Sequence, residues 1–177
     1  MLERHQTARL QLNAVAEHHL DELARLHSDP EVMATLGGVH DRAYNAAVLQ
    51  IAIAHWQQHG FGIWMAYDKQ SGRFAGRGGL KHTTVEGRDV VEVLYAFLPD
   101  FWGRGLALEL AVESIRVGFD ELHLPELACF TLTTNFKSQR VMERAGFRYQ
   151  RNFVHADLPH RLYRLTNEEH QHARPRA

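Results

Sequence analysis

Two glycines flank a single arginine, at Gly103, Arg104 and Gly105, where an apolar run meets a long amphipathic segment. The pattern before them is typical of a strand, and the pattern after them is typical of a helix. The first turn of a helix exposes backbone N–H groups without intrahelical partners, at the positive end of the helix dipole. Because glycine has no Cβ, a bulky anion can approach those donors closely. The spacing therefore predicts a phosphate cradle.

The glycine pair by itself does not identify the phosphate. A Walker loop needs a lysine and a hydroxyl residue after its last glycine, whereas Leu106 and Ala107 follow Gly105. A dinucleotide fingerprint needs glycine or alanine where this chain has Leu108, and no convincing acidic residue ends the next strand. An ordinary strand-to-helix turn is also compatible with the two glycines. The ligand has to be identified from the rest of the chain.

The apolar periodicity predicts the elements that position this loop. The expected order is β-α-α-β-β-β-α-β-α-β-β, an α/β layout with a mixed sheet. The helix of 41–59 is expected to place Val48, Ile51 and Trp56 on or near one face, and Asn135 is expected to cap a later helix. The predicted segments are 8–15, 16–29, 41–59, 61–67, 73–82, 90–98, 104–121, 126–134, 135–147, 147–156 and 160–165. Along 104–121, a bulky stripe is expected at Leu108, Val112, Ile115 and Phe119 and a stripe of small residues at Ala107, Ala111, Ser114 and Gly118, so this helix is expected to pack on more than one side.

Composition and charge narrow the class of protein. The 177 residues are expected to form a single domain, 1–177, with a frayed polar tail at 168–177. A formal net charge of −1 argues against a nucleic-acid binder. The first twenty residues carry charges where a signal peptide has an apolar run. No run of apolar residues approaches the roughly 20 that a membrane-spanning helix needs. The lone Cys129 favours a reducing, cytoplasmic setting.

Thirteen histidines raise the question of a metal site. His55 and His59 stand four residues apart on a predicted helix, which is a spacing that metal sites use. No third ligand lies nearby in sequence, and the helix ends at Gly60, where imidazoles favour the negative end of the dipole. We therefore expect no metal.

Three ordered segments carry a family resemblance: SGRFAGRGGL, VEVLYAFLPDFWGRGLALELA and NFKSQRVMERAGFRY. They resemble the GNAT superfamily of N-acetyltransferases, in its branch of RimJ/RimL-like ribosomal-protein enzymes. The resemblance implies an α/β GNAT fold with helices on both faces of a mixed, mostly antiparallel sheet of about seven strands. That sheet is splayed between strands 4 and 5, and acetyl-CoA lies in the split. The phosphate is then the CoA pyrophosphate.

The resemblance also implies a set of site residues. Backbone N–H groups from Gly103 to Ala107 bind the pyrophosphate, and Arg104 adds charge. The family usually has glycine where this chain has Leu94, a departure that leaves the size of the substrate open. The residues implied in cofactor binding are Phe97, Leu98, Gly103, Arg104, Gly105, Leu106, Ala107, Asn135 and Ser138.

Acetyl transfer to an amine requires a base, an oxyanion site and an acid. Glu92 is the candidate base, because it is the only carboxylate in its apolar run and burial raises the pKa of such a group. A structural carboxylate paired with an arginine is the alternative. The backbone N–H groups near Phe97 and Leu98 are the candidate oxyanion donors. The resemblance implies that Ser138, in the segment NFKS, is the acid, with Tyr95 as a substitute.

The predicted function is transfer of acetyl from acetyl-CoA to a primary amine, directly in a ternary complex. The acceptor is either a protein N-terminal α-amine or a small-molecule amine. A Glu92 base mildly favours an amine of low pKa, because an α-amino group near ~7.7–8.0 demands less of its base than a lysine near ~10.4. The alternatives are a catalytically silent acyl-CoA binder and a structural or partner-binding domain with an empty loop. We expect a monomer or homodimer without nucleic-acid or membrane partners.

Overall fold

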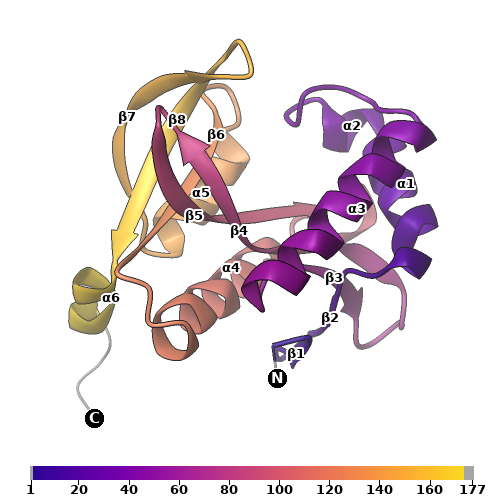
Figure 1. Ribbon diagram of the computed structural model, residues 1–177, viewed down its shortest axis with the longest axis horizontal. Helices are drawn as coiled ribbons and strands as arrows, with labels where there is room; N and C mark the ends of the chain where they lie inside the picture. The colour runs from indigo at the N-terminus through magenta and orange to yellow at the C-terminus, as the bar shows by residue number, and fades with distance from the viewer. Residues whose placement is uncertain (1, 174–177) are drawn as a thin grey trace.

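The computed structural model describes residues 2–173, and its centre is one eight-stranded sheet (Figure 1). Neighbouring strands follow the order β1-β2-β3-β4-β5-β6-β8-β7. Only the β5–β6 pair is parallel, and the other pairs are antiparallel. The strands are β1 (Arg4–Gln6), β2 (Leu10–Ala14), β3 (Ile63–Asp68), β4 (Phe74–Val85), β5 (Arg88–Phe97), β6 (Glu126–Leu132), β7 (Arg148–His155) and β8 (Leu158–Thr166).

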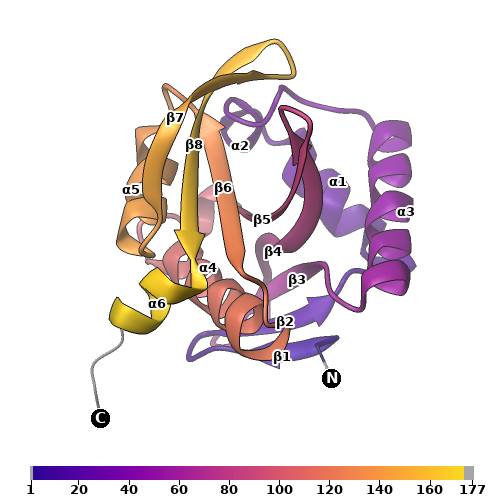
Figure 2. The same cartoon turned by 60° about the vertical axis from the view of Figure 1, so that its left-hand side comes forward.

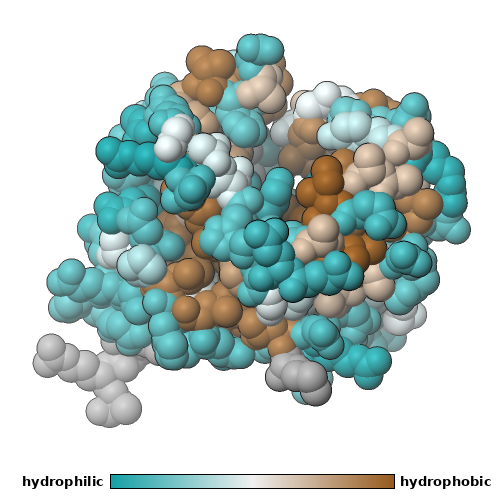
Figure 3. All heavy atoms as spheres, viewed as in Figure 1, coloured by the Kyte–Doolittle hydropathy of each residue, from teal (hydrophilic) through white to brown (hydrophobic). Residues whose placement is uncertain are grey.

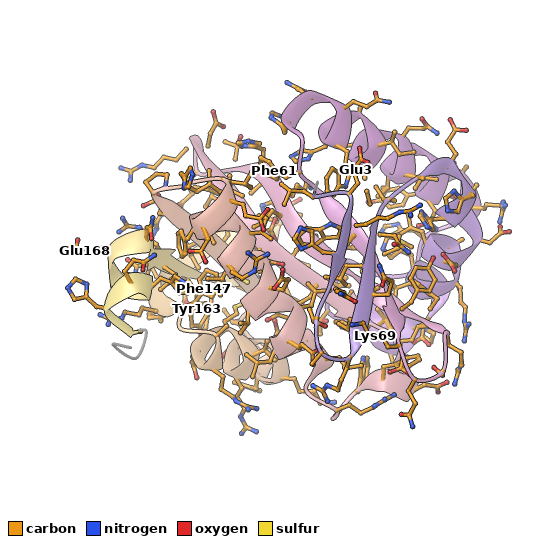
Figure 4. All side chains as sticks on the ribbon, turned by 90° about the horizontal axis from the view of Figure 1, so that it is seen from below. Glu3, Phe61, Lys69, Phe147, Tyr163 and Glu168 are labelled. Atoms are coloured by element: carbon orange, nitrogen blue, oxygen red, sulfur yellow. The ribbon has the colours of Figure 1, made fainter. Side chains whose placement is uncertain are left out.

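The additional strand is β1, a three-residue segment that the sequence pattern did not predict. Its residues are polar and too few to show an alternation, but Arg4 pairs with Asn13 at the edge of the sheet. Lys69, in the turn between β3 and β4, stabilises the β1–β2 hairpin. Its Nζ donates to Gln6 Oε1 (3.0 Å) and to the Thr7 carbonyl (2.6 Å). Figure 4 shows Lys69 beside this hairpin.

Helices cover both faces of the sheet, as predicted. Adjacent residues of β4 point to opposite faces: Arg77 contacts His27 of the first helix, whereas a Cβ on Gly78 would lie 2.5 Å from Leu110 of a later one. The same Cβ would lie 2.6 Å from the Leu94 carbonyl oxygen, so this position of the sheet requires glycine. The helices are η1 (Glu17–His19), α1 (Leu20–Ser28), α2 (Pro30–Met33), α3 (Arg42–His59), η2 (Pro99–Phe101), α4 (Leu106–Arg116), its π-helical extension η3 (Val117–Glu121), α5 (Phe136–Arg144) and α6 (Asn167–Ala173).

Three helix starts carry the side-chain caps that their sequences indicate. Asp29 accepts from two backbone N–H groups of α2, and Asp41 accepts from Tyr44 N–H at the start of α3. Asn135 accepts from Ser138 N–H at the start of α5. These caps satisfy donors that the helices cannot satisfy themselves. The start of α4, at Gly105, has no side-chain cap.

Some predicted faces were wrong. Ile51 is 65% exposed, whereas Trp56 of the same predicted face is buried, together with Leu49 and Asn45. Val112 is 50% exposed, although Ile115 and Phe119 of the same predicted stripe are buried. The other residues that α4 buries are Leu106, Leu110, Ala111 and Ser114.

The end of the chain also differs from its prediction. The residues 168–173 belong to α6 instead of a frayed tail, and Glu169 accepts from Thr166 N–H and Oγ1 to begin that helix. The last four residues, 174–177, lie outside the described part of the chain. Between residues 2 and 173, no helix is long and apolar enough to cross a membrane.

The sheet divides between β5 and β6, which are the fourth and fifth of the predicted strands. Glu92 and Ala128 are the one residue pair in register between them. The Cys129 thiol also bridges the two halves by donating to the Val93 carbonyl (3.0 Å). Figure 2 shows β6, β8 and β7 standing side by side as the second half of the sheet. The predicted split is confirmed.

Candidate active site

The loop before α4 has the conformation of an anion cradle. Gly103 (φ 71°) and Gly105 (φ 76°) both adopt left-handed backbone conformations, which side chains with a Cβ rarely tolerate. Space is open on both: an added Cβ on Gly103 would meet no atom within 4 Å, and one on Gly105 only the end of the Arg9 side chain. The glycines thus set the backbone geometry and leave room for a ligand.

The N-terminus of α4 offers free donors to that ligand. Its first backbone hydrogen bond runs from Glu109 N–H to the Gly105 carbonyl (3.1 Å). Within residues 2–173, the N–H groups of Leu106, Ala107 and Leu108 have no acceptor. Uncapped donors at the positive end of an eleven-residue helix fit a phosphate. The predicted cradle of Gly103, Gly105, Leu106 and Ala107 therefore has free backbone donors and left-handed glycines at an uncapped helix start.

Arg104 is placed differently from its predicted role. Its Nη2 contacts Asp68 Oδ1 (3.2 Å), and its guanidinium lies over the Phe101 ring. Asp68 is buried, and a hydrogen bond from the Ser71 hydroxyl is the main cause that lowers the pKa of its carboxyl. This carboxylate offsets the Arg104 charge, so the backbone donors contribute most of the attraction for an anion.

A second cation at the loop, Arg9, was missed by the sequence analysis. Its Nη1 donates to the Arg104 carbonyl (2.6 Å), and its Nε donates to Glu109 Oε2 (2.6 Å). Arg9 thereby connects β2 to the loop and to the first turn of α4. The residues are 95 positions apart in sequence, and no local pattern indicates their contact.

The two predicted oxyanion donors, Phe97 N–H and Leu98 N–H, point to opposite edges of β5. Leu98 N–H donates to the Ala75 carbonyl (2.8 Å), so it is not available and that prediction was wrong. Backbone groups of an antiparallel strand alternate between its two edges, so Phe97 N–H points away from β4, toward the split. The Phe97 carbonyl follows the same rule, because it accepts from Trp102 Nε1 (2.6 Å) instead of from β4. The β4–β5 ladder runs from Gly76 to Val85 without a register shift, so no bulge distorts it.

Tyr95 and Ser138, considered as alternative acids, are hydrogen-bonded to each other. Their hydroxyl oxygens are 3.1 Å apart, which joins β5 to α5 across the split. Burial raises the pKa of Tyr95 well above its usual value. Asn135 holds this corner, since it accepts from Ser138 N–H (3.2 Å) and its Nδ2 donates to Thr131 Oγ1 (3.0 Å). Asn135 therefore has the capping role that was its simpler interpretation.

Glu92 lies where the two halves of the sheet meet. It is half-buried, and desolvation raises the pKa of its carboxyl to about 7, against the opposing effects of Lys81 and Arg77. Neither cation comes within ion-pair distance, and no residue of the described chain donates a hydrogen bond to Glu92. The alternative of a structural carboxylate paired with an arginine thus has no contact to support it. A carboxyl with this pKa is suited to accept a proton near neutral pH.

The histidines form a cluster without a metal geometry. His82, which is distant in sequence, joins His55 and His59, with ring centroids 4.3–5.7 Å apart. Both nitrogens of His55 are engaged: Nδ1 contacts the Phe61 carbonyl (2.9 Å), and Nε2 accepts from His82 N–H (3.0 Å). Across the described residues, no group of three His, Cys, Asp or Glu side chains could hold a metal ion.

The surface carries a notch. Figure 3 shows it between the β7–β8 hairpin and the lobe that carries α2 and α3. Exposed apolar side chains lie on both of these segments: Val154 and Leu158 on the hairpin, and Leu36, Val39 and Tyr44 on the opposite lobe. A separate hollow of about 810 Å³ between β1, β2 and α3 shares no residue with the loop or with Glu92.

Comparison with known proteins agrees with this geometry. The model of the acetyltransferase (GNAT) domain family matches residues 9–148. An uncharacterized protein of Bacillus subtilis, YkkB, is 29% identical over 78% of this chain and 80% of its own length. FsC-acetyl coenzyme A-N(2)-transacetylase of Aspergillus fumigatus is 31% identical over 83% of this chain and 66% of its own.

A solved structure shows the same architecture. The acetyltransferase from Agrobacterium tumefaciens superposes with a TM-score of 0.81 at 25% identity, and the match covers 93% of this chain and 95% of that one. The family match spans most of the sheet, the loop and α5, where the predicted site residues lie. The chain belongs to the GNAT family of acetyltransferases.

Proposed function

We propose that the protein transfers an acetyl group from acetyl-CoA to a primary amine, directly in a ternary complex. The observation that carries the proposal is the uncapped, glycine-framed start of α4 next to a split sheet that has Glu92 at its junction. GNAT acetyltransferases use acetyl-CoA, which supplies the activated thioester. The proposal extends this family property to the residues of this chain.

On this proposal, the N–H groups of residues 106–108 bind the pyrophosphate, and the pantetheine arm follows the split between β5 and β6. Phe97 N–H donates to the thioester oxygen as negative charge develops there. Glu92 takes a proton from the amine, directly or through water, and its pKa of about 7 suits that role. The bonded pair of Tyr95 and Ser138 donates a proton to the leaving sulfur.

The amine acceptor enters through the notch between the β7–β8 hairpin and the α2–α3 lobe. The exposed apolar residues on these segments suit a peptide or a small organic amine better than a highly hydrated ligand. Leu94 lies on the same face of β5 as Glu92 and is half-buried. Its side chain narrows the path of the acceptor to Glu92, at a position where the family usually has glycine. We propose a RimJ/RimL-like, cytoplasmic enzyme of one domain.

Two measurements test the proposal. Calorimetric titration should show CoA binding to the wild type, and release of the free thiol should be observed when acetyl-CoA and an acceptable amine are both present. A suitable panel contains N-terminal peptides, polyamines and aminoglycosides. CoA binding without thiol release from any amine would favour the silent acyl-CoA binder. Absence of CoA binding would leave only a structural or partner-binding role.

A further inference from the structure

Arg77 is a half-buried cation without a carboxylate partner. None of the ion pairs formed within residues 2–173 includes it. Arg116, which is equally half-buried, contacts the carboxylates of Glu113 and Glu121. A guanidinium that loses part of its hydration is normally compensated by an anion. Arg77 therefore lacks the partner that its burial calls for.

Buried neutral groups hold this guanidinium in place. Arg77 Nε donates to His27 Nε2 (3.1 Å), and His27 Nδ1 contacts Asn45 Oδ1 (2.6 Å). Desolvation, with help from the Arg77 charge, lowers the pKa of His27 to about 4, so this ring is neutral and donates from Nδ1. Asn45 is itself fixed by donating to the Asp41 carbonyl (2.8 Å). The chain of contacts ends on backbone and supplies no charge.

The outer end of the guanidinium is free. In the part of the chain that the structure describes, neither Nη1 nor Nη2 of Arg77 has a hydrogen-bond acceptor. These two groups form the planar fork that binds a carboxylate through two parallel hydrogen bonds. The Arg77 guanidinium is held at Nε by His27, whereas its two Nη groups are unbound. This arrangement suits a ligand from outside the chain.

Arg77 shares a face of the sheet with the candidate base. In the regular β4–β5 ladder, Arg77 is opposite Ala96, and Lys81 is opposite Glu92. Alternate residues along a strand point to the same face, so Arg77 and Glu92 both lie on the side of α1 and α3. They are separated by four positions along the ladder, which corresponds to about 13 Å between backbones.

We infer that Arg77 binds a carboxylate of the acceptor, which is therefore an amine that also carries an acidic group. This inference rests on the proposed function, because it takes Glu92 as the place of the reacting amine. The acidic group must lie within about 13 Å of that amine. A carboxylate side chain near the N-terminus of a peptide satisfies this distance, and so does a small amino acid with a flexible chain.

Arg77 has one competing role, which is to act on Glu92 alone. Its positive charge is one of the two that lower the pKa of the Glu92 carboxyl, after that of Lys81. In that case its removal would shift the pH dependence of turnover equally for every acceptor. Selectivity between acidic and neutral acceptors is the property that only a carboxylate-binding role predicts.

The test uses pairs of peptide amides with a free N-terminus, in which one member carries a carboxylate and the other the corresponding amide. Each pair carries either Asp or Asn at its second, third or fourth position and alanine elsewhere, and 6-aminohexanoate and its amide form a small-molecule pair. Calorimetry with the CoA-loaded protein gives the Kd of each acceptor without requiring turnover. Thiol release from acetyl-CoA is measured in parallel on the same preparations.

In the wild type, one or more acidic acceptors should bind about 10–100-fold more tightly than their neutral counterparts, as expected for a charge-assisted contact. Arg77→Gln should reduce this ratio to near one, and Arg77→Lys should retain only part of it. Arg161 offers a matched control: it is half-buried without an ion pair, but it contacts Gln139 of α5. Arg161→Gln should leave the ratio unchanged.

Equal affinities within every pair in the wild type would overturn the inference, and so would a ratio that survives in Arg77→Gln. If that variant does not fold, Arg77→Lys decides, because an unchanged ratio there would show that the planar fork is not used. A preserved ratio without thiol release would contradict the proposed function and support the carboxylate site. The two claims therefore fail separately.

Discussion

The two faces of β5 are built from different chemistry. On the side of α4 and α5, the groups near the split are neutral: hydroxyls of Tyr95 and Ser138 and the free N–H groups that begin α4. On the side of α1 and α3 the groups are ionisable: Glu92, Lys81 and Arg77. The neutral groups suit a cosubstrate that is the same in every reaction and is bound by backbone donors. The ionisable groups suit discrimination among different amines.

The helix starts of the molecule show the same contrast. Asp41 caps α3 and satisfies its first donors within the chain. Gly105 at the start of α4 supplies no side chain, and its left-handed backbone directs the loop so that the donors stay free. A helix start without a cap loses about 1 kcal/mol of stability relative to a capped one. We interpret this loss as the structural requirement for binding an anion there.

The largest effect is expected from Gly105→Asp. The substitution places a Cβ at a φ of 76° and a negative charge beside the pyrophosphate. We expect the Kd for CoA to rise by about 100-fold, which corresponds to roughly 3 kcal/mol, because the added carboxylate repels the pyrophosphate. Calorimetry measures this change.

Gly105→Asn is the matched control for this prediction. Asparagine has nearly the same shape, tolerates left-handed backbone and carries no charge. It should weaken CoA binding clearly less than Gly105→Asp. Equal Kd values for the wild type and Gly105→Asp would remove the cradle from this loop, and with it the contrast between the two faces.

A smaller effect is expected from Ser138→Ala. Removal of the hydroxyl breaks its contact with Tyr95 and should lower kcat by about 10–100-fold, because one hydrogen bond to the leaving group is lost. The helix cap should survive, since the donor to Asn135 is the Ser138 backbone N–H. Measuring kcat and melting temperature on one preparation separates a role of the Ser138 hydroxyl in proton transfer from a role in the stability of α5.

Tyr95→Phe sharpens the same experiment. Because the two hydroxyls are in contact, the double variant should lose less than the sum of the single losses in activation free energy. An unchanged kcat in both single variants would exclude the pair as the proton donor.

The smallest effect is expected from Asn135→Ala. It removes the cap of α5 and the contact with Thr131, so the free energy of unfolding should fall by about 1 kcal/mol. Denaturant unfolding measures this, and Asn135→Ser is the control because serine also caps helices. A variant with wild-type stability but much lower kcat would assign Asn135 a direct role on the α5 side of the split.

The sequence was informative where function depends on local backbone. The glycines at 103 and 105, the cap at Asn135 and the half-buried carboxylate at Glu92 all follow from residue type and neighbours within one element. The split was anticipated through the resemblance to a family. Arg9 and the His27–Asn45 support of Arg77 were not anticipated, because they join segments that are distant in sequence.

Two errors have the same physical origin. Leu98 N–H was expected to be free, but pairing with Ala75 of β4 consumes it, and ladder phase cannot be derived from one strand. Ile51 and Val112 were grouped with Trp56 and Ile115 from periodicity alone, but they are exposed, because tertiary packing decides which part of an apolar helix face is covered.

The most direct test of the account is the pH dependence of kcat/KM for the wild type and Glu92→Gln with one peptide amine. With Glu92 as the base, wild-type activity should rise as pH increases through about 7, where the carboxyl loses its proton. Glu92→Gln should lower kcat by about 10²–10⁴-fold at neutral pH with CoA affinity unchanged, and the loss should shrink in alkaline solution. A loss that does not depend on pH, or wild-type activity in Glu92→Gln, would contradict the assignment of the base to Glu92.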